Sequence, residues 1–227
     1  MTNIPSIHRD PLADEDFWWL IGYLQGDGSV DLRNGIWFHS TDRELIETAK
    51  RIVANLFSLD SSIYVEKPVY PWKPRLRLAV YSRALVGWLI NRQLRFGTQR
   101  WNVPRLSSNL FCSYLGGLFD AEGQVILGCS GKVYRFVIHS ANGHSLRTIA
   151  QRISEFGVEY SLKARKRHGK PSVHYQLEIR RRRNLEWFAR NVGKRSRLQR
   201  KNRFMTEEFL PRESIQKHLK QVDEFRE

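Results

Sequence analysis

Length, composition and charge already narrow the kinds of protein that this chain can be. Its 227 residues, 41% hydrophobic and 12% aromatic, suffice for one large or two small folded domains. Lysine and arginine outnumber aspartate and glutamate by 38 to 23, and the net charge of +15 favours a polyanionic partner such as nucleic acid. No apolar run approaches ~18 residues, and residues 1–16 are polar and acidic, which argues against a membrane partner and a secretory signal. We expect an intracellular protein, cytoplasmic or organellar.

The first half of the chain predicts the order helix, strand, strand, helix, strand, strand, helix. Three acids at residues 14–16 favour a helix N-terminus, and an apolar run follows them. Residues 29–33 and 36–40 are expected to form a hairpin through an Asn34-Gly35 turn. The remaining elements of this half are expected at 42–57 (helix), 63–66 and 75–81 (strands) and 83–91 (helix).

The second half repeats this order of elements. Strands are expected at 124–129, 133–140, 160–166 and 172–180, and helices at 146–156 and 185–192. The whole pattern predicts an α+β fold of two pseudo-symmetric αββαββα repeats, each with one antiparallel sheet. We divide the chain into halves 1–106 and 107–227. The second half is the more basic of the two, and we expect it to end in a basic helical tail.

Two nine-residue segments define the repeat. Leu-Ile-Gly-Tyr-Leu-Gln-Gly-Asp-Gly occupies residues 20–28, and Leu-Gly-Gly-Leu-Phe-Asp-Ala-Glu-Gly occupies residues 115–123. Each contains small residues four apart, which let two helices approach until their backbones nearly touch. We therefore expect the two motif helices to pack at a pseudo-twofold axis through Gly22, Gly26, Gly117 and Ala121. The glycines that end the segments, Gly28 and Gly123, suit the left-handed conformation just past a helix C-terminus.

Each segment carries an acid directly before its last glycine, and these acids, Asp27 and Glu122, stand 95 residues apart. A helix C-terminus disfavours a carboxylate by about 0.3–1 kcal/mol, so stability alone would place a basic residue there. Two carboxylates close together, beside the helix-end carbonyl groups of Gly26 and Ala121, form an all-oxygen site suited to Mg²⁺ or Mn²⁺. The alternative is a pair of ordinary exposed helix ends, and the repetition in both copies makes it the weaker interpretation.

These segments resemble the paired motifs of the LAGLIDADG homing endonucleases, although Gln25 stands where that family usually has aspartate. The resemblance implies a monomeric, metal-dependent enzyme that cuts both strands of duplex DNA at a long asymmetric site. It implies that Asp27 and Glu122 are catalytic and hold the metal. It also implies a basic residue from each half near the scissile phosphates: Arg100 in the first half, and Lys201 or Arg200 in the second.

Strand alternation predicts a polar, basic outer face on each sheet, and the two faces together form a saddle suited to the major groove of DNA. An antiparallel sheet commonly has one solvated face, so each residue on it also has an ordinary surface interpretation. The predicted DNA-contacting residues are Arg33, Arg75, Arg77, Tyr81, Lys163, Arg165, Arg167, His174, Gln176 and Arg180.

Two other functions remain open on the same fold. One is an RNA-binding maturase that helps an intron to splice, and the other is a DNA-binding regulator with an inactive site. The acids retained in both motifs favour cleavage. His39 and His139 are open to a water-positioning, base-contacting or structural role. The chain opens Met-Thr-Asn and ends Phe-Arg-Glu, unlike a protein-splicing element, so we expect an intron-encoded or free-standing protein.

Overall fold

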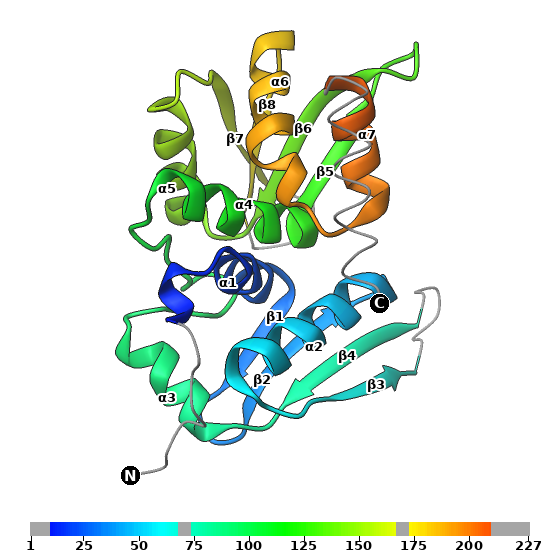
Figure 1. The fold of residues 1–227 in the computed structure, drawn as a ribbon. Coiled ribbons are helices and arrows are strands. Elements are labelled where there is room, and N and C mark those ends of the chain that lie inside the picture. Colours follow the sequence, from blue (N-terminus) through cyan, green and yellow to red (C-terminus); the bar gives the residue numbers. More distant parts are fainter. Residues whose placement is uncertain (1–9, 68–73, 167–172, 210–227) are drawn as a thin grey trace.

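The computed structural model describes residues 10–67, 74–166 and 173–209, which form two similar halves on either side of a central helix pair (Figure 1). The first half contains η1 (Pro11–Ala13), α1 (Glu15–Asp27), β1 (Gly28–Asp31), β2 (Gly35–Ser40), α2 (Arg43–Phe57), β3 (Ser62–Glu66), β4 (Arg75–Val80) and α3 (Arg83–Asn91). The second half contains α4 (Ser108–Glu122), β5 (Gly123–Leu127), β6 (Val133–Ser140), α5 (Gly143–Ser154), β7 (Tyr160–Lys166), β8 (Val173–Ile179), α6 (Arg182–Asn191), η2 (Gly193–Arg195) and α7 (Gln199–Phe209).

Each half holds one antiparallel sheet of four strands, ordered β1-β2-β4-β3 in the first half and β5-β6-β8-β7 in the second. Their registers correspond, because His39 lies opposite Arg77 in one sheet and His139 lies opposite Gln176 in the other. Helices pack on one face of each sheet, so the opposite face is left open. The predicted α+β fold of two pseudo-symmetric αββαββα repeats is confirmed. Within the described ranges, no helix is both long and apolar enough to cross a membrane.

The two motif helices, α1 and α4, run in the same direction and are in backbone contact. A Cβ atom added to Gly22 would lie 2.0 Å from the carbonyl oxygen of Tyr114, and one added to Gly117 would lie 1.9 Å from that of Trp19. Only glycine permits this approach, which accounts for two residues that cost a helix roughly 1 kcal/mol each. The sequence prediction that the motif helices pack on each other is therefore confirmed.

The glycines that end the two motifs serve a different purpose from the predicted one. Gly28 has φ −114° and Gly123 has φ −85°, so the prediction of a left-handed conformation was wrong. A Cβ atom on Gly28 would lie 2.5 Å from the carbonyl oxygen of Leu24, and one on Gly123 would lie 2.3 Å from that of Phe119. Glycine is needed because each chain turns from helix directly into strand against its own last helical turn.

The first hairpin also differs from its prediction. Residues 32–34 form its turn, and Gly35 already pairs with Asp31, so the expected two-residue Asn34-Gly35 turn was wrong. The Asp31 carboxylate accepts hydrogen bonds from the Arg33 backbone N–H at 2.8 Å and the Asn34 side chain at 2.6 Å, and these fix the longer turn.

We expect Gly22→Ala and Gly117→Ala each to lower the free energy of unfolding by about 1–3 kcal/mol, because each new methyl group collides with backbone of the facing helix. Gly87→Ala is the control: Gly87 lies within α3 with no atom within 4 Å of an added Cβ, and we expect a gain of about 0.5–1 kcal/mol. Urea unfolding of the three variants measures the expected loss of stability at Gly22 and Gly117 and the expected gain at Gly87. Equal effects at all three positions would contradict the close helix contact.

Candidate functional site

The last turns of α1 and α4 bring Asp27 and Glu122 to one place. A Cβ atom on Gly26 would lie 2.4 Å from the Ala121 Cβ and 3.2 Å from the Glu122 Cγ, so the helices still touch where the two acids begin. Both carboxylates are partly buried. The sequence alone placed them 95 residues apart, and the glycine-mediated packing converts that separation into direct electrostatic contact.

Burial disfavours the ionised forms of both acids, and a neighbouring carboxylate adds to this effect at each: Asp27 at Glu122, and Asp42 at Asp27. Burial and, to a smaller extent, the negative charge of Asp27 raise the pKa of Glu122 to about 7, against the opposing charge of the Lys201 ammonium. Burial also raises the pKa of Asp27, against the opposing charges of Lys201 and Arg75. Strong shifts of this kind gather at functional sites, because a site that concentrates negative charge prepares a place for a cation.

Lys201, from α7, packs against the C-terminal end of α4, and only 6% of its surface is exposed. Its ammonium group donates hydrogen bonds to the carbonyl oxygens of Phe119 and Asp120, both at 2.8 Å. Burial lowers the pKa of Lys201 to about 8, while the charges of Asp120 and Asp27 act in the opposite direction. Among the described residues, Lys201 is the one buried lysine or arginine. Its charge acts on both motif acids.

A cavity of about 420 Å³ opens beside Asp27. Two cations from different halves line it: Arg75 from β4 and Arg200 from α7. Arg200 reaches the first half by pairing with Asp42 at 3.0 Å. His39 also lines the cavity, and burial together with the charge of Arg75 lowers its pKa, against the opposing charge of Glu66. The cavity thus places fixed positive charge next to one of the two paired carboxylates.

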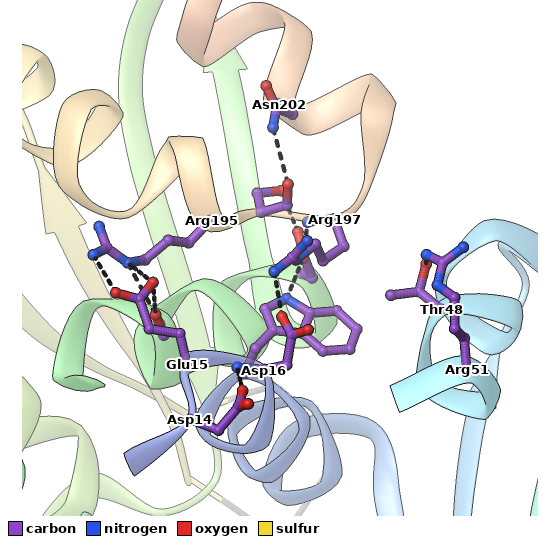
Figure 2. Close-up of polar contacts among 12 residues, drawn as sticks. Asp14, Glu15, Asp16, Thr48, Arg51, Arg195, Arg197 and Asn202 are labelled. Carbon is purple, nitrogen blue, oxygen red and sulfur yellow. Dashed lines mark hydrogen bonds and ion pairs between the residues drawn. The ribbon is translucent and has the colours of Figure 1, made fainter. Parts of the chain in front are cut away.

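The segment between α6 and α7 crosses from the second half onto α1, and this crossing brings Lys201 and Arg200 to the site. Figure 2 shows Arg195 above Glu15 and Arg197 above Asp16. The Arg195 guanidinium contacts both carboxylate oxygens of Glu15, at 3.0 and 3.1 Å, and Arg197 forms an ion pair with Asp16. Ser113 of α4 bonds to Glu15 at 2.9 Å, so the same carboxylate ties both motif helices to the crossing segment.

Gln25 and Asp120 occupy matching positions, each two residues before its motif acid, and each anchors the segment that trails its own half. Gln25 donates from its amide to the carbonyl oxygens of Arg95 (2.8 Å) and Asn102 (3.1 Å), and it accepts from the Tyr114 hydroxyl at 2.7 Å. Asp120 accepts from the Trp19 indole at 2.9 Å, from the backbone N–H of Arg197 at 2.7 Å and from the Ser196 hydroxyl. The departure from the family pattern at residue 25 therefore preserves the anchoring role with a neutral side chain.

The structure brings several of the predicted catalytic residues together. Asp27, Glu122 and Lys201 come together, with Gly26 and Ala121 at the contact between the helix ends. Arg100 lies on an exposed turn, where its backbone N–H donates to the Gly97 carbonyl oxygen at 2.9 Å. The cation that acts on Asp27 from the first half is Arg75, which the sequence had indicated only as a DNA contact.

The predicted DNA-contacting residues lie on the open faces of the two sheets and at their edges. Arg75 and Arg77 alternate with the buried Leu76 and Leu78, which face the core. In the second sheet the outer residues are Lys163 and Arg165 on β7 and His174 and Gln176 on β8, with Arg180 directly after β8. Tyr81 is exposed just past β4, Arg33 lies in the first hairpin turn, and Arg167 is outside the described residues.

Sequence reasoning missed the carboxylates that lie between these cations. Glu66 pairs with Arg75 at 2.7 Å in the first sheet. Glu178 pairs with Lys163 at 3.0 Å and with Arg180 at 2.6 Å in the second. Alternation already placed Glu178 on the polar face of its strand, but its burial depends on cross-strand neighbours that alternation does not identify.

Comparison with known proteins supports the fold of two similar halves. The LAGLIDADG-like domain family matches residues 14–91 and 112–193, once in each half. An uncharacterised protein from Methanocaldococcus jannaschii is 28% identical over 165 residues, which cover 70% of this chain and 60% of that protein. The isomerizing glutamine–fructose-6-phosphate aminotransferase of the same organism is 25% identical over 190 residues, which cover 77% of this chain and 16% of that protein. The match therefore spans less than two thirds of either relative.

Solved structures of three proteins share the fold. I-WcaI bound to its DNA recognition sequence has a TM-score of 0.63 at 15% identity, over 86% of this chain and 88% of that one. I-DmoI in complex with DNA and Mn has a TM-score of 0.56 at 18% identity, over 78% and 96%. Full-length DUF199/WhiA from Thermatoga maritima has a TM-score of 0.58 at 17% identity, over 98% and 70%.

We expect Glu122→Gln to stabilise the metal-free protein at about pH 8 by about 1–3 kcal/mol, and to change stability little at about pH 4. The folded pKa of about 7 lies above the ordinary value of 4.5, so protonation favours the folded state. In wild type, that stabilisation is fully present below pH 4.5 and is lost as pH rises through about 7. The neutral glutamine of the variant does not ionise, so the variant keeps its stability at high pH.

Denaturant unfolding in the presence of a chelator, at both pH values, measures this dependence. Glu47→Gln is the control, because Glu47 forms only an exposed pair with Arg43 and the change should have little effect at either pH. A Glu122→Gln protein that is less stable than wild type at about pH 8 would contradict the conclusion that the ionised Glu122 carboxylate destabilises the folded protein.

Proposed function

The chain belongs to the LAGLIDADG-like domain family, and on that premise we propose that it is a site-specific endonuclease that hydrolyses both strands of duplex DNA. The observation that carries the proposal is the meeting of Asp27 and Glu122 at the adjoining ends of α1 and α4. Their raised pKa values and the nearby Lys201 are unfavourable for stability alone, and a reaction on a phosphodiester explains them. Structural neighbours that bind DNA, I-DmoI and I-WcaI, support this choice of substrate.

The donor atoms at the helix ends fit Mg²⁺ or Mn²⁺. Asp27 and Glu122 would hold the ion through their carboxylates, together with the carbonyl groups of Gly26 and Ala121. Among the residues that the structure describes, no group of three or more His, Cys, Asp or Glu side chains is arranged as a metal site. Two carboxylates leave coordination positions for water and for phosphate oxygens, as Mg²⁺ prefers. When bound, the ion supplies activation of a water and stabilisation of charge on the phosphate.

The protein's own residues would orient the DNA around this centre. Arg75 and Arg200 line the cavity beside Asp27 and would hold the scissile phosphate there. Lys201 would stabilise negative charge that develops in the transition state, because its charge already acts on both acids. The first half has no buried cation among its described residues, so this role falls to one lysine in place of one basic residue per half.

The two open sheet faces would bind the two halves of the target in its major groove. The faces differ at matching register positions: Arg77 in the first sheet corresponds to Gln176 in the second, and Tyr64 corresponds to Lys163. Arginine favours guanine and glutamine favours adenine, so a target with two unlike halves is expected. One chain supplies both faces, and the protein would therefore act as a monomer.

We expect wild-type protein with Mg²⁺ to cut a randomised duplex DNA library at discrete sites, and Asp27→Asn and Glu122→Gln each to reduce cutting on the order of 100-fold or more. Sequencing of the released ends identifies the target. Protein that selects a sequence but leaves it intact would instead act as a DNA-binding regulator. If it neither selects nor cuts DNA, while it binds structured intron RNA, a maturase function replaces the nuclease.

We expect Arg200→Gln to slow cleavage of the identified target on the order of 10-fold, because it removes one cation from the cavity beside Asp27. Arg203→Gln is the matched control on the same helix, since Arg203 pairs with Glu207 and does not line the cavity. Single-turnover cleavage with saturating protein separates the chemical step from binding. Equal rates for the two variants would contradict a role of Arg200 at the phosphate.

A further inference from the structure

A buried carboxylate lies at the centre of the open face of the second sheet. Glu178 has 1% of its surface exposed, although it lies in β8 on the face that carries the predicted DNA contacts. Its carboxylate pairs with Arg180 at 2.6 Å, with Lys163 at 3.0 Å and with Arg135 at 3.5 Å. These cations come from β6, β7 and the end of β8, so one acid connects three adjacent parts of the sheet. We call Glu178, Arg135, Lys163 and Arg180 the Glu178 cluster.

The Glu178 cluster is fixed in position and still carries excess positive charge. Burial alone would raise the pKa of Glu178, but hydrogen bonds from Lys163 and Arg180, with the charge of Arg135, lower it below its ordinary value. One negative charge against three positive charges leaves the cluster cationic. The side chains of Lys163, Arg180 and Arg135 remain 42%, 39% and 26% exposed, so the cluster is still accessible from solvent.

An aromatic ring supports the same two guanidinium groups. The Tyr134 ring centroid lies 5.6 Å from the Arg135 Cζ and 5.5 Å from the Arg180 Cζ. Arginine side chains that are held by a carboxylate and a ring lose much of their rotamer freedom before any ligand arrives. The donor groups of the cluster are therefore presented in a set geometry.

Among its described residues, the first sheet has no equivalent cluster at this position. Its register places Ala79 opposite Ser62, where the second sheet places Glu178 opposite Ser161. The nearest comparable acid, Glu66, lies in the edge strand and is 26% exposed, and it pairs with Arg75 and Arg77. The Glu178 cluster is thus a property of the second half alone.

We propose that Glu178 is a positioning residue that holds Arg135, Lys163 and Arg180 as one fixed reader of guanine in the second half of the DNA target. This inference rests on the proposed DNA-binding function. Guanine presents two acceptors, O6 and N7, in the major groove, and a fixed arginine fork matches them. Free arginine and lysine side chains would instead follow the phosphates, which carry no sequence information. The Glu178 carboxylate therefore lowers the affinity for DNA of any sequence and raises the selectivity for guanine.

The test compares selection from a randomised duplex DNA library by wild type and Glu178→Gln, with Mg²⁺ omitted so that DNA remains intact. We expect wild type to enrich guanine at defined positions in one half of the site. Glu178→Gln should reduce that preference on the order of 10-fold and leave the other half of the site unchanged. Its binding to a non-selected duplex should strengthen and become more salt-dependent, with the salt slope steeper by about 1.

Glu66→Gln is the control for position in the molecule, because any change that it causes should fall in the opposite half of the site. Arg180→Lys tests the cluster without removing a charge: it should lose the guanine preference and keep the salt slope of wild type. If Glu178→Gln does not fold, Arg180→Lys alone tests whether the Glu178 cluster reads guanine.

The outcomes separate this inference from the proposed function. Wild type that selects no sequence would overturn both proposals. Selective wild type with an unchanged guanine preference in Glu178→Gln, or in Arg180→Lys if the first variant does not fold, overturns only the role of the cluster. A change spread equally over both halves of the site overturns it as well, because it would indicate a general loss of structure.

Discussion

The close contact between α1 and α4 is the constraint on which the rest of the site depends. Gly22 and Gly117 each lie so near the facing helix that any side chain would meet a carbonyl oxygen within about 2 Å. This contact fixes the helix ends together, and Asp27 and Glu122 then share one partly desolvated place. Their raised pKa values follow from the packing, because burial at the adjoining helix ends disfavours both ionised carboxylates and brings the charge of Asp27 close to Glu122.

A second constraint determines which cations reach those acids. Arg195 and Arg197 tie the segment after α6 to the first turn of α1 (Figure 2), and α7 starts from that anchor. This places Lys201 against the end of α4 and Arg200 at the cavity beside Asp27. Contacts at one end of α1 thus set the electrostatics at its opposite end, and the two halves are joined by charge as well as by helix packing.

Local sequence signals predicted the fold and the two acids, because these depend on periodicity and on a repeated motif. The boundaries of β6 and β7 follow from alternation, and the meeting of Asp27 with Glu122 follows from small residues four apart. Contacts between distant segments were not predictable in this way. Arg75 was predicted only as a DNA contact, yet its charge acts on Asp27, and the burial of Glu178 arises from three strands that only the folded sheet brings together.

The buried charges explain why one motif has Gln25 where the other has Asp120. Lys201 is buried beside Asp120, and a buried ammonium requires a nearby negative charge. No buried cation accompanies the matching Gln25 among the described residues, and a carboxylate there would be a third acid beside Asp27 and Glu122 without compensation. Gln25 anchors its segment by donating to the carbonyl oxygens of Arg95 and Asn102, which a carboxylate could not do. A neutral residue in one motif and an acid–lysine pair in the other are two solutions to the same packing problem, and they make the halves of the site chemically unequal.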